Sequence, residues 1–134
     1  MAKKGFVGKI EKETESNTDF RRVLYTGQHS QLVLMSLKPG EEIGEETHDN
    51  VDQFFRFEEG HGIVVIDGVE HEVKEGYAAI VPSGARHNVI NNAKKHDLKL
   101  YTIYSPPEHV DQVVRHTKAE ALARPEEYDG KPTE

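Results

Sequence analysis

Four side chains that can bind a metal ion fall into two short stretches in the middle of the sequence. Glu46, His48 and Gln53 lie in the first stretch, and His87 lies in the second. Side chains on a strand alternate between its two faces, so Glu46 and His48 would point the same way and grip one ion. Carboxylate, imidazole and amide groups suit divalent cations such as zinc, manganese, nickel or iron. The sequence therefore predicts a divalent metal site and leaves the identity of the metal open.

Turn signals indicate how these ligands would converge. We expect the strand that begins at Gln53 to pair antiparallel with the strand of Glu46 and His48, after a short turn. His87 must then arrive from a distant strand. The Pro-Ser-Gly turn at residues 82–84 supplies a sharp reversal before it, because Pro fixes φ and Gly permits positive φ.

Short strands at close spacing predict a sandwich or barrel. Asp67-Gly68, between two apolar runs, is a type I′ hairpin signal. Thr117 and Glu120 form a capping-box pattern that predicts a short helix, which Pro125 would end. The expected strands are Arg22 to Thr26, Gln31 to Leu37, Glu46 to His48, Gln53 to Glu58, Gly62 to Ile66, Val69 to Val73, Ala78 to Val81, Asn88 to Ile90 and Leu98 to Tyr104.

The two stretches resemble the paired motifs of the cupin superfamily, Gly-x5-His-x-His-x3-4-Glu-x6-Gly and Gly-x5-Pro-x-Gly-x2-His-x3-Asn. The first motif matches at Gly40, His48 and Gly60. It departs from the usual pattern at Glu46, where the family has His, and at Gln53, where the family has Glu. The second motif matches at every specified position: Gly76, Pro82, Gly84, His87 and Asn91.

This resemblance implies an all-β fold, a single-domain cupin jelly-roll β-barrel with a short C-terminal helix. The usual cupin site offers three imidazoles and one carboxylate. Two imidazoles, one carboxylate and one amide would leave the formal charge at the metal unchanged here. Cupin-type phosphomannose isomerases bind zinc with the same ligand types, and cupins that linearise unsaturated uronates carry Gln at the position of Gln53. The leading interpretation is a metal-dependent, non-redox isomerase or ring-opening enzyme acting on a small sugar or sugar acid.

Two other interpretations remain open. The same ligands could hold iron in a cupin dioxygenase. The barrel could instead be a scaffold that binds a small ligand without turnover, since Glu46 lies in an acidic stretch and could be a solvated carboxylate. Fold membership alone does not decide among these functions.

Candidates for moving a proton come from the end of the barrel. His109 follows the last strand and could fold over the barrel mouth as an acid or base, although an exposed loop histidine is the alternative. Tyr101 is a second candidate, but strand alternation alone does not decide whether it or Tyr104 faces the pocket. Arg56 and Arg86 neighbour ligand positions and should point outward, so the sequence reveals no cationic clamp for a phosphate.

Composition sets the outer bounds. The chain has 134 residues, a length typical of one domain, and no cysteine for disulfides or thiolate ligands. The formal net charge is −7, and the basic residues are scattered, which argues against nucleic-acid binding. The N-terminus lacks a secretory or membrane-spanning segment, so cytoplasmic residence is expected. We divide the chain into an N-terminal arm at 1–19, a cupin barrel at 20–107, and a C-terminal loop, short helix and polar tail at 108–134. The arm and the family resemblance favour a homodimer.

Overall fold

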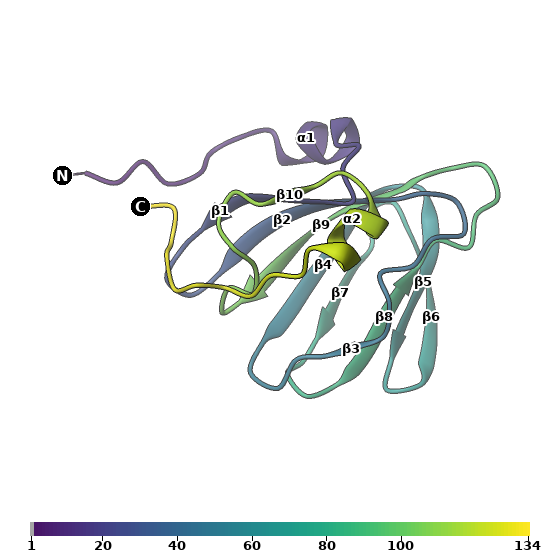
Figure 1. Ribbon diagram of the computed structural model, residues 1–134. Helices are drawn as coiled ribbons and strands as arrows, with labels where there is room; N and C mark the ends of the chain where they lie inside the picture. Colours follow the sequence, from purple (N-terminus) through teal and green to yellow (C-terminus); the bar gives the residue numbers. More distant parts are fainter. Residues whose placement is uncertain (1) are drawn as a thin grey trace.

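The protein is described by a computed structural model that covers residues 2–134, and it consists of two antiparallel sheets that face each other (Figure 1). The sheets are not joined into a closed ring, so the barrel is a two-sheet jelly roll with an open side. The larger sheet has the order β10-β1-β2-β9-β4-β7 and the smaller one has the order β3-β8-β5-β6. In chain order, the strands of the two sheets are β1 (Arg21–Thr26), β2 (Gln31–Leu37), β3 (Glu46–Thr47), β4 (Asp52–Glu59), β5 (His61–Ile66), β6 (Val69–Lys74), β7 (Ala78–Val81), β8 (Arg86–Ile90), β9 (Leu98–Ser105) and β10 (Val114–Arg115).

Alternation along the strands separates the interior from the outer face. In β4, Gln53, Phe55 and Phe57 are buried, whereas Phe54 and Arg56 between them are partly exposed. This period of two is what a strand with one packed face requires. The predicted all-β fold is therefore confirmed, and its core lies between the two sheets. That core includes Val33, Met35, Leu37, Phe55, Phe57, Val64, Val89, Leu98 and Leu100.

The predicted hairpin turn and helix cap can be compared with the backbone of the structure. Asp67 and Gly68 both have positive φ, 46° and 82°, as the two central residues of a type I′ hairpin need. They join β5 to β6 in the register Ile66 to Val69. Thr117 caps helix α2 (Lys118–Ala123), because its side-chain oxygen accepts a hydrogen bond from the Glu120 backbone nitrogen at 3.0 Å. Both signals are confirmed.

The N-terminal segment differs from the expected polar arm. Residues Ile10–Ser16 form helix α1, which packs against β4 and β9 of its own chain. Lys99 explains why the helix ends there: its ammonium donates to the backbone oxygens of Glu15 at 3.0 Å and Asn17 at 2.8 Å. This lysine lies far along the chain, so no local sequence signal announced the helix. No helix in residues 2–134 is long and apolar enough to cross a membrane.

Candidate metal centre

Parts of the two motif stretches form neighbouring strands, β3 and β8, at one edge of the smaller sheet. β3 pairs antiparallel with β8, which sets Glu46 directly opposite His87. Gly84, whose φ is 87°, donates its backbone N–H to the His48 carbonyl at 2.8 Å. The predicted turn before His87 thus has the conformation expected of it and also ties the second motif to the first.

Gln53 reaches the site from the opposite wall. The expected pairing of its strand with that of Glu46 is wrong, because β4 lies in the larger sheet between β9 and β7. The Gln53 side chain is 3% exposed and crosses the interior, where its Oε1 lies 3.1 Å from His87 Nε2. Its Nε2 donates to Thr102 Oγ1 at 3.0 Å, which fixes the amide orientation. A facing sheet, rather than a neighbouring strand, supplies the fourth ligand candidate.

The four candidate ligands form two close pairs. His48 Nε2 lies 3.0 Å from Glu46 Oε2, and His87 Nε2 lies 3.1 Å from Gln53 Oε1. The two imidazole rings are 5.4 Å apart, centre to centre. Within residues 2–134, no three His, Cys, Asp or Glu side chains form one compact cluster that could hold an ion. The donors are gathered as two pairs, one within the smaller-sheet side and one that joins His87 to Gln53 of the facing sheet.

The chemistry of these donors nevertheless fits a cation. Nδ1 of His87 faces the Ala85 carbonyl at 3.4 Å and Nδ1 of His48 faces Glu108 at 3.6 Å, so both Nε2 atoms are turned toward the other donors. His48 Nε2 is buried, and its close contact is the Glu46 carboxylate, 3.0 Å away but poorly oriented for a hydrogen bond. Two atoms that bind one ion at about 2.1 Å and at right angles lie about 3.0 Å apart, which matches the spacing within each pair.

Electrostatics also distinguishes the two histidines. Contact with Glu46 raises the pKa of His48 above its usual value, despite partial burial. Burial lowers the pKa of His87. Burial alone would raise the pKa of Glu46, but the nearby imidazoles and Arg21 lower it overall. Glu46 is therefore held as a carboxylate that can act as a ligand, with 34% of its side chain exposed.

Beside these pairs lies a chain of three hydrogen-bonded groups. His109 Nε2 lies 3.2 Å from the Tyr104 hydroxyl, and His109 Nδ1 lies 3.0 Å from Glu126 Oε1. Tyr104 also packs edge-on against the ring of His48 at 6.2 Å. His109 is buried, and this burial lowers its pKa. The neutral ring then donates from Nδ1 to Glu126 and accepts from the tyrosine at Nε2.

Tyr101 lies on the other side of the sheet. The register pairs Tyr101 with Arg56 on the outer face, and its ring packs against Phe54. Tyr104 instead pairs with Gln53 on the inner face. Of the two sequence-predicted residues for proton transfer, the structure brings His109 to the site and places Tyr101 away from it. Tyr104 occupies the position that the sequence left undecided.

Gln31 holds the loop that carries His109. It is 1% exposed, and its Oε1 accepts from the backbone nitrogens of Glu108 at 3.2 Å and His109 at 2.9 Å. Its Nε2 donates to the His109 carbonyl at 2.7 Å and to Thr26 Oγ1 at 2.9 Å. Every donor and acceptor formed by this amide is thus used to fix the loop over the sheet. His109 owes its position to a buried glutamine, not to its own place in the sequence.

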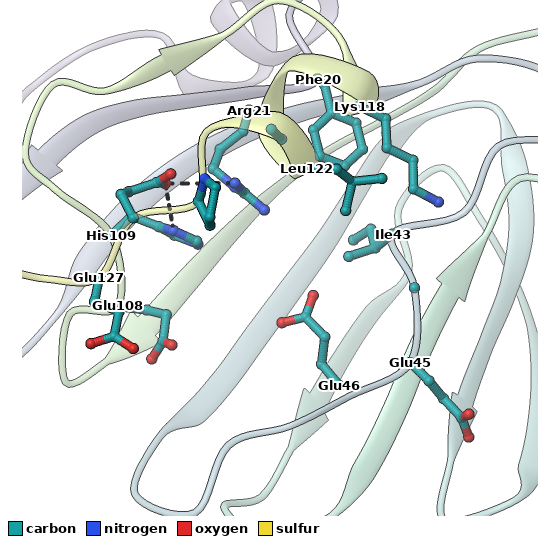
Figure 2. A pocket seen from close by; sticks show the side chains of 14 residues that line it. Phe20, Arg21, Ile43, Glu45, Glu46, Glu108, His109, Lys118, Leu122 and Glu127 are labelled. Carbon is teal, nitrogen blue, oxygen red and sulfur yellow. Dashed lines mark hydrogen bonds and ion pairs between the residues drawn. The ribbon is translucent and has the colours of Figure 1, made fainter.

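A cavity of about 780 Å³ opens onto these groups between β1, the segment before β3 and helix α2 (Figure 2). Glu46, Glu108 and His109 line it, whereas His48, Gln53 and His87 are not among its lining residues. Its other walls carry Phe20, Arg21, Ile43, Gly44, Glu45, Lys118, Ala121, Leu122, Pro125, Glu126 and Glu127. A small polar molecule in this cavity would meet the ligand candidates at Glu46.

Three residues of the site were not singled out from the sequence. Tyr104 lies two residues from Thr102 and therefore on the same face of β9. It could have been chosen over Tyr101 if the pairing of β9 with β4 had been known. Arg21 shares parity with the buried Val23, but the strand was expected to start one residue later. Glu126 lies in what was expected to be a polar tail and offers no local signal. Arg86, by contrast, is largely exposed as expected, and Arg56 is partly exposed on the outer face.

The fold and the site together define a small β-sandwich protein in which Glu46, His48, Gln53 and His87 gather beside a polar pocket that Glu46 lines. The cupin domain model matches residues 33–104, which is more than half of the chain. The chain therefore belongs to the cupin family.

Relatives support this assignment. The uncharacterized protein YrkC of Bacillus subtilis is 47% identical over 126 residues, which cover 90% of this chain and 67% of YrkC. The crystal structure of BH2720 from Bacillus halodurans superposes with a TM-score of 0.87 at 46% identity, covering 90% of this chain and 96% of that one. A shorter match, 38% identity over 59 residues, relates 44% of this chain to 38% of the dimethylsulfoniopropionate lyase DddW of Ruegeria pomeroyi.

Proposed function

We propose that this cupin binds a divalent cation through Glu46, His48, Gln53 and His87. Cupins generally bind a metal. The observation that carries the proposal here is the convergence of four donors in two close pairs, with His48 Nε2 3.0 Å from the Glu46 carboxylate and His87 Nε2 3.1 Å from Gln53 Oε1. Each spacing is what two atoms bound to one ion would have. Binding would draw the two pairs toward one centre.

The reaction we infer is a non-redox isomerisation or ring opening of a small sugar or sugar acid. The bound ion would act as a Lewis acid on a substrate oxygen. The protein supplies the remaining requirement, which is a group that moves a proton. Tyr104 packs against His48 and is hydrogen-bonded to His109, which Glu126 holds in turn. A buried acid–base pair of this kind suits proton transfer more than it suits oxygen chemistry.

Tyr104 and His109 can move a proton without forming a free tyrosinate. Burial raises the pKa of Tyr104, so its hydroxyl keeps a proton at neutral pH. When the hydroxyl oxygen receives a proton from the substrate, its own proton passes to His109 Nε2. The resulting imidazolium is then stabilised by Glu126, 3.0 Å from Nδ1. The same path run backward returns the proton to a neighbouring carbon or oxygen of the substrate.

A lyase reaction is the second candidate, favoured by the sequence match to the dimethylsulfoniopropionate lyase DddW. Such a reaction is also non-redox and also needs a proton acceptor beside the bound substrate. Incubation with dimethylsulfoniopropionate, followed by NMR, separates the two candidates. Consumption of this compound, with no change in sugars, would replace the isomerase proposal.

Metal content provides the first test. Protein purified without chelators should hold about one divalent ion per chain by mass spectrometry. His87→Ala should lose most of it, whereas His71→Ala, an exposed histidine on β6, should not. An ion-free wild type, or equal ion content in both variants, would refute the proposal.

Turnover is tested separately. Uronates and aldoses are incubated with the metal-loaded protein, with and without oxygen, and followed by NMR. Conversion should proceed equally in the absence of oxygen and stop when a chelator removes the ion. Oxygen-dependent consumption would instead indicate the dioxygenase alternative, and binding without conversion would indicate a scaffold.

A further inference from the structure

One buried cation on the cavity wall lacks partners for its donors. Arg21 begins β1, and its register with Met35 places it on the inner face of the sheet. The side chain is only 12% exposed, and Nε has no hydrogen-bond partner. Its ion-pair contact, Nη1 to Glu126 Oε1, measures 3.6 Å and is too long for a hydrogen bond. The guanidinium therefore has unused donors beside the cavity.

The neighbouring Arg115, in contrast to Arg21, has hydrogen-bond acceptors for its donors. Its Nε and Nη2 donate to the Arg124 carbonyl at 3.2 and 2.9 Å, and Nη2 also lies 3.2 Å from Glu126 Oε2. Glu126 thus provides one negative charge for two permanent cations and also accepts from His109. With His109 neutral, this cluster keeps one net positive charge, which Glu46 and the other carboxylates of the cavity offset only from a distance.

Arg21 and the ligand candidate Glu46 line the same cavity. In Figure 2 the Arg21 guanidinium and the Glu46 carboxylate extend into it from opposite walls. A molecule bound between these walls would touch Arg21 at one end and the metal ligands at the other. His109 lies on the same side of the cavity as Arg21, so the proton-transfer groups would flank the molecule.

We propose that Arg21 binds the carboxylate of the substrate, so that the substrate class is a small organic acid and not its neutral counterpart. The inference rests on the proposed function. Glu46 is the one charged group among the four proposed ligands, so a divalent ion bound there would keep one positive charge in excess and would also attract an acid. A planar carboxylate matches the two-pronged guanidinium. A phosphate dianion fits less well, because Glu45, Glu108 and Glu127 also line the cavity.

The test compares acids with neutral analogues of the same shape. Binding of D-galacturonate and D-galactose, and of propionate and propionamide, is measured by calorimetry on zinc-loaded protein. Wild type should prefer the acid in at least one pair by about tenfold to a hundredfold, the range of a charge-assisted hydrogen bond. Arg21→Met should abolish that preference, and Arg21→Lys should keep part of it. Arg22→Met is the matched control, since Arg22 is exposed and pairs with Asp19.

The outcomes separate the two proposals. Zinc content is measured on every variant, and thermal unfolding shows whether Arg21→Met is folded; if it is not, Arg21→Lys gives the comparison. A zinc-loaded wild type without preference for either acid, or a preference that survives the loss of Arg21, overturns this inference alone. Stronger binding of inorganic phosphate than of either acid also overturns it. A wild type that cannot hold zinc overturns the proposed function, and the acid preference of the metal-free protein then decides the role of Arg21.

Discussion

The two ends of the barrel interior are built from the same strands but differ in chemistry. On the larger sheet, the row of inward residues nearest the site is polar and contains Gln31, Tyr104 and Gln53. Two rows farther along β2, β9 and β4, the corresponding row is Met35, Leu100 and Phe57. One end resembles an ordinary hydrocarbon core, whereas the other resembles a binding site. The change takes place within four residues along each strand.

This difference shows how one small sandwich can be stable and still hold buried polar groups. The polar end is costly unless its donors and acceptors are paired, and most of them are. Gln31 makes four hydrogen bonds and Gln53 makes contacts to Thr102 and His87. Of the three buried side-chain atoms without a well-oriented hydrogen bond in residues 2–134, Nε of Arg21 and Nε2 of His48 lie at this end, and Nε of Arg56 lies on the outer face beside Glu58. We infer that the apolar end carries stability and that the polar end carries binding.

The largest expected effect comes from the apolar end. Phe57 is fully buried and stacks on Phe55, with ring centres 6.3 Å apart. Phe57→Ala should lower the free energy of unfolding by about 3–5 kcal/mol, through lost burial and a remaining cavity. Chemical denaturation measures this loss. The ion content of the folded variant should equal that of wild type. A variant that keeps its stability but loses the ion would show that the two ends do not have separate roles.

A smaller stability effect, with a large effect on turnover, is expected at the polar end. Tyr104→Phe leaves His109 Nε2 without its partner, so the free energy of unfolding should fall by only about 1–2 kcal/mol. Turnover should fall about a hundredfold, because the hydroxyl is the link between substrate and His109. Tyr101→Phe on the outer face is the matched control and should change neither quantity. Equal turnover by the two variants would remove Tyr104 from the mechanism.

The same division decides what could be predicted from the sequence. Alternation and turn chemistry are local, so the strands β1 to β9, the Asp67-Gly68 hairpin and the Thr117 cap were predicted correctly, whereas the two-residue strand β10 was not. Motif spacing identified Glu46, His48, Gln53 and His87 as residues that approach one another, although not that Gln53 comes from the facing sheet. Contacts between residues that are far apart in the sequence left no such signal. Lys99 capping α1 is one example.

The residues that surround the ligands illustrate the same limit more sharply. Choosing Tyr104 over Tyr101 requires the register between β9 and β4, which a single strand does not contain. Glu126 reaches His109 only because the chain returns over the cavity after α2. The inward face of Arg21 follows from pairing with Met35. Each depends on three-dimensional neighbours, so the sequence located the centre of the site but not the groups that would act around it.

The smallest expected effect is a shift in the pKa of His109, which isolates one group at the polar end. Burial lowers this pKa most, and Arg21 lowers it further, whereas Glu126 and Glu108 raise it. NMR titration of zinc-loaded protein should therefore place the pKa of His109 below about 6.5, the value of a free histidine. The signal is assigned by its loss in His109→Gln.

Removing the Glu126 carboxylate should move that titration in a defined direction. Glu126→Gln takes away a negative charge that favours the imidazolium, so the pKa of His109 should fall further. Because His109 accepts the proton only when neutral, the acidic limb of the pH–rate profile should shift to lower pH by the same amount, while the plateau rate falls. Glu127→Gln, at a neighbouring cavity position with no contact to His109, is the control. A rise in the pKa of His109, or a limb that stays in place while the NMR pKa moves, would show that His109 is not the group that accepts the proton.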